Sequence, residues 1–108
     1  MDRSSEFGGR AAFVTGAGTG IGAAVACELA SRGAAVAIFG RRAARLAETA
    51  EAIRSAGGKV LVIAGDVANA ENVESAILRT VAEFGGLHFA VNNAGVDGGT
   101  QKDRKSVV

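Results

Sequence analysis

The sequence predicts an α/β domain with a doubly wound parallel sheet that is truncated after its fourth strand. Two observations support this fold class. Short apolar runs alternate with longer segments in which apolar residues recur at helical spacing, and glycines stand at most boundaries between them. The first three apolar runs are also continuous rather than alternating, as expected for strands covered on both faces. The predicted strands are 10–14, 34–39, 59–64 and 88–91, and the predicted helices are 20–32, 41–56 and 69–84.

Length and composition fit one domain with an ordinary core. The chain has 108 residues, of which 48% are apolar and 21% charged, and its formal net charge is +1. This balance gives no support for binding to nucleic acid or to a membrane surface through bulk charge. The sequence contains neither the apolar core of a signal peptide nor an apolar run long enough to span a membrane, so we expect a cytoplasmic location.

Residues 96–108 break the alternation of strands and helices. They show no periodicity and are rich in charged side chains, so we expect an irregular polar tail after a domain that ends at residue 95. The fourth strand is then expected to remain an open apolar edge, through which chains could associate with one another. A truncated gene model is an alternative explanation of the tail.

The stretch TGAGTGIG, residues 15–22, joins the first predicted strand to the first predicted helix. Glycine permits positive φ and close approach to a ligand, and the free N–H groups of a helix N-terminus attract phosphate. Glycines 16, 20 and 22 fit the spacing G-x-x-x-G-x-G rather than the more common G-x-G-x-x-G. We therefore predict a dinucleotide-binding loop, with a plain tight turn as the alternative, and expect Gly18 only to be tolerated in it.

Three motifs in order, each at the end of a predicted strand, resemble those of the short-chain dehydrogenase/reductase family. They are the T-G-x-x-x-G-I-G loop at 15–22, the pair Asp66-Val67 and the sequence Asn92-Asn93-Ala94-Gly95. The resemblance extends over residues 7–96. It implies a Rossmann-type domain at residues 1–95 that binds NAD(P). It also implies that this domain belongs to an oxidoreductase transferring hydride between a nicotinamide cofactor and a carbonyl or alcohol.

The resemblance assigns cofactor contacts to residues of these three motifs. Gly16 is implied to form the tight turn, and the following loop residues to surround the pyrophosphate and the helix start. Asp66 is implied to accept a hydrogen bond from the adenine amino group, although its carboxylate alone fits a turn cap equally well. Asn93 is implied mainly to tie the central strands together. The implied cofactor-binding residues are Gly16, Thr19, Gly20, Ile21, Gly22, Asp66, Val67, Asn92, Ala94 and Gly95.

The end of the second predicted strand bears on the choice between NADP and NAD. Proteins that bind NAD usually carry a carboxylate there, about twenty residues after the glycines, which holds the ribose 2′-hydroxyl. Here Gly40 takes that position, and Arg41 and Arg42 follow, whose guanidinium groups suit a 2′-phosphate. We predict NADP as the cofactor, with NAD less favoured. The alternative is that both arginines merely begin a solvated helix.

We assign no catalytic residues. The family resemblance implies a Tyr-x-x-x-Lys pair and a serine for hydride transfer, and the sequence has no tyrosine, so we expect this chain to be inactive alone. Alternatives are a non-catalytic dinucleotide-binding module, a subunit completed by a partner chain, and a methyltransferase, against which Gly40 and the motif at 92–95 count. No metal site is expected, because His88 is the single histidine and Cys27, the single cysteine, is interpreted as a small packed side chain.

Overall fold

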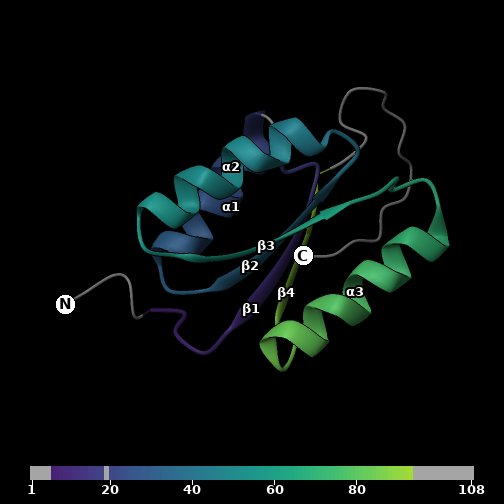
Figure 1. The fold of residues 1–108 in the computed structure, drawn as a ribbon. Helices are drawn as coiled ribbons and strands as arrows, with labels where there is room; N and C mark the ends of the chain where they lie inside the picture. The colour runs from purple at the N-terminus through teal and green to yellow at the C-terminus, as the bar shows by residue number, and fades with distance from the viewer. Residues whose placement is uncertain (1–5, 19, 94–108) are drawn as a thin grey trace.

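Parallel strand pairing organises the protein into a sheet with a helical layer on each face (Figure 1). The computed structural model describes residues 6–18 and 20–93. The elements are β1 (Ala11–Thr15), α1 (Gly20–Ser31), β2 (Ala35–Gly40), α2 (Ala43–Ser55), β3 (Lys59–Ala64), α3 (Ala70–Phe84) and β4 (Phe89–Asn92). The strand order is β3-β2-β1-β4 and every neighbouring pair is parallel. α1 and α2 cover one face of the sheet, and α3 covers the other.

The predicted elements are confirmed, with bounds that differ by at most two residues. The largest difference is at α2, where the prediction placed both arginines inside the helix. Arg42 instead has extended backbone angles (φ −101°, ψ 97°) and is the N-cap, so Arg41 and Arg42 precede the helix. Asn69 likewise caps α3, since its side chain accepts a hydrogen bond from the backbone N–H of Asn72.

The core is built largely from small side chains. All five residues of β1 and the four central residues of β2 are buried, as expected for strands covered on both faces. Nine of the 17 buried apolar residues in the described part of the chain are alanines. Larger side chains fill the remaining space, and the rings of Phe13 and Phe39 lie 5.7 Å apart under α3. The alanines allow the helices to approach the sheet closely.

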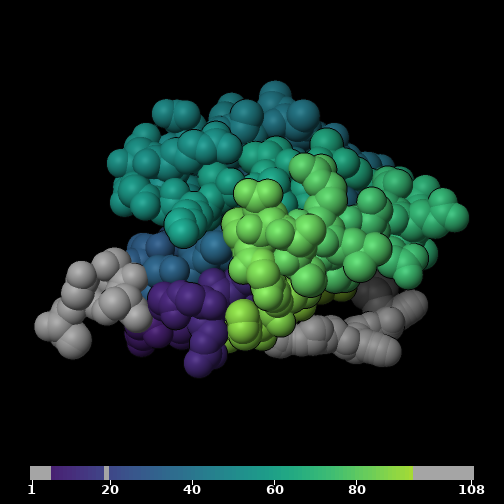
Figure 2. Space-filling view, turned by 60° about the horizontal axis from the view of Figure 1, so that its bottom comes forward, coloured from purple at the N-terminus to yellow at the C-terminus, as the bar shows by residue number. Residues whose placement is uncertain are grey.

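α3 buries Ala76 and Thr80 against the sheet and leaves Leu78 65% exposed. Figure 2 shows the chain from α3 towards β4, in green, across the middle of one face of the molecule. In the part of the chain that the structure describes, none of the helices is long and apolar enough to cross a membrane.

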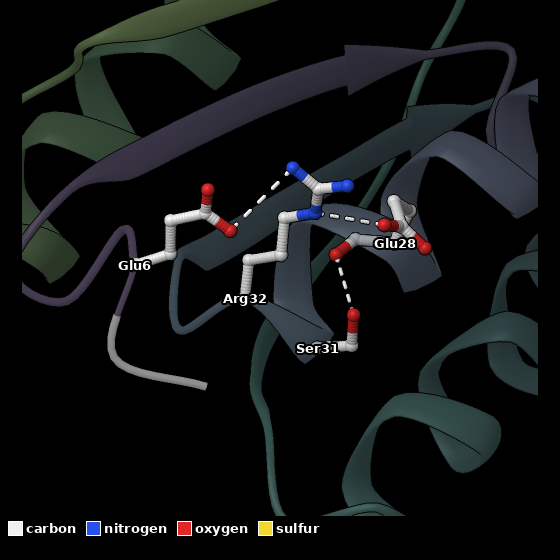
Figure 3. Close-up of polar contacts among 4 residues, drawn as sticks. All are labelled: Glu6, Glu28, Ser31 and Arg32. Atoms are coloured by element: carbon white, nitrogen blue, oxygen red, sulfur yellow. Dashed lines mark hydrogen bonds and ion pairs between the residues drawn. The ribbon is translucent and has the colours of Figure 1, made fainter. Parts of the chain in front are cut away.

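The segment before β1 is fastened to the end of α1 and to β4. The guanidinium of Arg32 lies between two carboxylates, with Nε 2.7 Å from Glu28 Oε2 and Nη1 3.5 Å from Glu6 Oε1 (Figure 3). It also lies over the ring of Phe7, 5.9 Å from the centroid. The rings of Phe7 and Phe89 in turn pack edge to face, with 5.2 Å between their centroids.

β4 is an edge strand of the described sheet, as the sequence predicted. Its residues alternate between half-buried and exposed, unlike the continuous burial of β1 and β2. His88, which precedes β4, is joined to Ala11 by two hydrogen bonds. The backbone N–H of His88 donates to Ala11 O at 2.9 Å, and His88 Nδ1 accepts from the backbone N–H of Ala11 at 3.0 Å.

Candidate functional site

The candidate residues lie at the carboxyl ends of the four strands, which meet at one edge of the parallel sheet. The loop after β1, the arginines after β2, the Asp66 turn after β3 and the asparagines at the end of β4 all belong to this edge. Binding sites of open α/β sheets are found at such an edge. The fold therefore brings together residues that are up to 78 positions apart in sequence.

Gly16, in the loop after β1, and Gly20, the first residue of α1, adopt positive φ of 64° and 59°. The Gly16 N–H donates to Phe39 O at 3.0 Å, which ties the start of the loop to β2. A Cβ atom on Gly22 would lie 2.7 Å from the carbonyl carbon of Gly16 and closer still to its oxygen. The loop therefore folds back onto the first turn of α1, and Gly22 makes that contact possible.

Gly18 has a packing role that the sequence interpretation missed. A Cβ atom on Gly18 would lie 3.0 Å from Arg45 Cβ, tighter than ordinary van der Waals contact. The expectation that Gly18 is only tolerated is thus wrong, since the loop backbone lies directly on α2. Thr49 of α2 adds a hydrogen bond, in which Oγ1 donates to Ala17 O at 2.9 Å.

Thr15 joins the end of β1 to the end of β4. Its hydroxyl donates to Asn92 Oδ1 at 3.0 Å and accepts from the backbone N–H of Asn93 at 2.9 Å. The side-chain amide of Asn93 lies beside α1, because its Nδ2 would be 2.9 Å from a Cβ on Gly22. The two asparagines are therefore held against the end of β1 and the first turn of α1.

Arg41 and Arg42 are exposed at the end of β2, and within residues 6–18 and 20–93 neither forms an ion pair. Gly40 is the last residue of β2, and its carbonyl accepts from the N–H of Gly65 at 2.8 Å. A Cβ on Gly40 would meet only Leu46, at 3.4 Å. This corner of the site therefore offers positive charge without a carboxylate partner among the described residues.

Asp66 acts as a turn cap, the alternative that the sequence left open. Its Oδ1 accepts from the backbone N–H of Ala68 at 2.9 Å, and its own N–H donates to Asn72 Oδ1 at 2.9 Å. Within the described ranges its Oδ2 has no partner, so the cap leaves one carboxylate oxygen available. Val67 beside it is 40% exposed.

Ile21, in the first turn of α1, is 67% exposed, and Gly20 next to it has nothing within 4 Å of its open side. Thr19, Ala94 and Gly95 lie outside the described residues. Among the residues that are described, no group of His, Cys, Asp or Glu is arranged to hold a metal ion. The groups that are present, backbone N–H donors, guanidinium groups and apolar side chains at one edge, fit a phosphate-bearing nucleotide.

The sequence and the fold both match known proteins. The family described as short chain dehydrogenase matches residues 10–107. A hydroxynaphthalene reductase of Aspergillus fumigatus is 44% identical over 90 residues, 82% of this chain and 33% of that protein. A dehydrogenase/reductase from Sinorhizobium meliloti, of known structure, has a TM-score of 0.82 at 46% identity, over 88% of this chain and 38% of that one.

A third match includes a bound cofactor. The F189W variant of actinorhodin polyketide ketoreductase, solved with NADPH, has a TM-score of 0.76 at 32% identity, over 80% of this chain and 33% of that one. The chain spans about a third of the length of the curated relatives that it matches. The matched part contains the loop, the arginines, Asp66 and the asparagine motif described above. The chain therefore belongs to the short-chain dehydrogenase family of oxidoreductases and corresponds to its N-terminal, Rossmann-type part.

Proposed function

We propose that this chain binds NADP(H) at the carboxyl edge of its sheet, as the cofactor-binding part of a short-chain dehydrogenase. The observation that carries the proposal is the pair of exposed arginines directly after Gly40, next to the glycine loop, which form no ion pair with any described residue. A carboxylate at position 40 would repel a 2′-phosphate, whereas two guanidinium groups attract it. The ketoreductase solved with NADPH supports the same choice by analogy.

In this proposal each group at the site has a separate task. The N–H groups of the loop and of the first turn of α1 hold the pyrophosphate, with Gly22 letting the two approach. The free oxygen of Asp66 accepts from the adenine amino group, and Val67 covers the ring. Asn92, oriented by Thr15, faces the ribose side. The cofactor would donate hydride to a carbonyl in its reduced form or accept hydride from an alcohol in its oxidised form, and the substrate of the whole protein is such a carbonyl or alcohol.

Calorimetric titration with NADPH and NADH tests the choice of cofactor. Replacing both arginines (Arg41→Ala with Arg42→Ala) should weaken NADPH binding by about tenfold to 100-fold, because charge-assisted hydrogen bonds to the 2′-phosphate are lost. NADH binding should stay within about twofold. Arg54→Ala is the matched control, since Arg54 lies in the last turn of α2. Equal NADPH affinity in the double variant and the control would refute the assignment.

Gly40→Asp tests the same site with the opposite charge. The added side chain has room beside Leu46, so the expected effect is electrostatic: weaker NADPH binding and stronger NADH binding.

A coupled assay tests activity separately, because we propose that the chain, which has no tyrosine, transfers no hydride alone. Enzyme-like NADPH oxidation with any carbonyl substrate would contradict that part of the proposal.

A further inference from the structure

The glycine loop rests on α2 through a buried hydrogen bond. Thr49 is 5% exposed, and its Oγ1 donates to Ala17 O at 2.9 Å, a shorter contact than the 3.5 Å to Arg45 O in its own helix. Ala17 is fully buried in the cluster that contains Leu46 and Ala50. A buried carbonyl without a donor is costly, so the Thr49 hydroxyl favours one orientation of the peptide between residues 17 and 18.

This orientation decides where the Gly18 N–H points. In a trans peptide the C=O and N–H bonds point in opposite directions, and no peptide bond described here is cis. With Ala17 O turned towards α2, the Gly18 N–H is turned away from Thr49. Within residues 6–18 and 20–93 this N–H donates to no acceptor. It is therefore a free backbone donor in the loop that the proposed function assigns to phosphate binding.

A second contact from the same helix limits the movement of the loop. The Arg45 Cβ occupies the space beside Gly18, one turn of α2 before Thr49. α2 begins immediately after Arg42, whose carbonyl accepts from the N–H groups of Arg45 and Leu46. The arginine segment and the glycine loop are thus connected through the first two turns of α2.

We propose that Thr49 is a positioning residue of the dinucleotide site, a role that rests on the proposed function. It does not touch the ligand. Its hydroxyl holds the Ala17 carbonyl against α2 and so turns the Gly18 N–H towards the sugar–phosphate chain of a bound NADP(H). α2 acts as a fixed support for the loop, and the Thr49 hydroxyl sets the loop's orientation on it.

The test uses the full chain and compares Thr49→Val, which removes the hydroxyl at nearly constant volume, with Thr49→Ser, which keeps it. Thr80→Val is the matched control, because Thr80 is fully buried in α3 and its hydroxyl donates within that helix, to Ala76 O at 2.8 Å. NADPH titration by calorimetry should show about tenfold weaker binding for Thr49→Val. Thr49→Ser and Thr80→Val should stay within about twofold of the parent chain.

Amide hydrogen exchange gives a second readout that does not depend on cofactor. In the free protein Thr49→Val should speed exchange of the Gly16 amide, which donates to Phe39 O at 3.0 Å, whereas Thr80→Val should leave that amide unchanged. If circular dichroism shows that the valine variant is unfolded, Thr49→Ser is compared with Thr49→Ala, since the two differ by one oxygen atom. NADPH binding should then be about tenfold weaker for alanine than for serine.

The possible failures are distinguishable. A parent chain that binds neither NADPH nor NADH overturns the proposed function, and the positioning role falls with it. A parent chain that binds NADPH, with Thr49→Val binding equally well, overturns the positioning role alone. An equal loss of affinity in Thr49→Val and Thr80→Val also overturns it, because the effect would then follow from losing any buried hydroxyl.

Discussion

Gly22→Ala separates two effects of opposite sign on the free energy of unfolding. Gly22 is in the first turn of α1, and helix propensity alone predicts that alanine stabilises a helix by about 1 kcal/mol relative to glycine. The structure predicts the opposite. A Cβ on Gly22 would lie 2.7 Å from the Gly16 carbonyl carbon, closer to its oxygen, and 2.9 Å from Asn93 Nδ2.

The clash determines how far Gly22→Ala lowers the free energy of unfolding. Two of the three atoms belong to the backbone of Gly16, which Phe39 and β1 hold in place, so movement of the Asn93 side chain alone cannot relieve the clash. Such overpacking costs about 3 kcal/mol, the upper end of its usual range. After subtraction of the propensity gain, Gly22→Ala should destabilise the chain by roughly 2 kcal/mol, a fall in Tm of about 8–16 °C.

Thermal unfolding followed by circular dichroism measures this change, and NADPH titration measures its effect on the loop. Affinity should fall at least about 100-fold, because the loop and the first turn of α1 must separate. Gly85→Ala is the control: its φ of 84° strains an alanine, but nothing lies within 4 Å and it is far from the loop in sequence. An unchanged or higher Tm for Gly22→Ala would refute the reasoning.

Two further predictions concern the amino ends of the strands, opposite the candidate site. His88→Ala leaves the N–H of Ala11, a residue only 2% exposed, without its acceptor, so the free energy of unfolding should fall by about 1–3 kcal/mol in denaturant titrations. An unchanged midpoint would show that the bond contributes nothing. Arg32→Gln removes two ion pairs of half-exposed side chains, which should cost under about 1 kcal/mol and less still in about 1 M salt. A loss that high salt leaves intact would mean that the packing of the Arg32 guanidinium over the Phe7 ring, rather than the ion pairs, is what matters.

The elements could be predicted from the sequence because their signals are local. Continuous apolar runs marked the strands, and glycines such as Gly33 and Gly85 marked helix ends, where both have positive φ. The start of α2 was misplaced because arginine is not a typical N-cap and its side chain makes no capping bond there. The extended backbone of Arg42 is therefore a consequence of its position in the fold.

The contacts within the site were harder to predict, because their partners are distant in sequence. The bond from Thr49 to Ala17 spans 32 positions, and the contact of Gly18 with Arg45 spans a similar distance. In the sequence Thr49 has the context of an ordinary helix residue, and nothing near it indicates a hydrogen-bond partner outside the helix. Gly18 differs from Gly16 and Gly20 in lacking positive φ, so only its neighbour on α2 explains why a glycine stands there.

The alanines of the core limit which sequence changes the fold can accept. A core of large side chains can shrink at one position and grow at another, but an alanine can be replaced only by glycine, which frees the backbone, or by something larger. Ala17, Ala26 and Ala50 are each fully buried between the sheet, the loop and the helices. Added volume at any of them would push a helix away from the sheet. Because the glycine loop rests on α2 and α1, a displacement of either helix would also displace the site. Selection for ligand binding would therefore also constrain buried residues that do not contact the ligand.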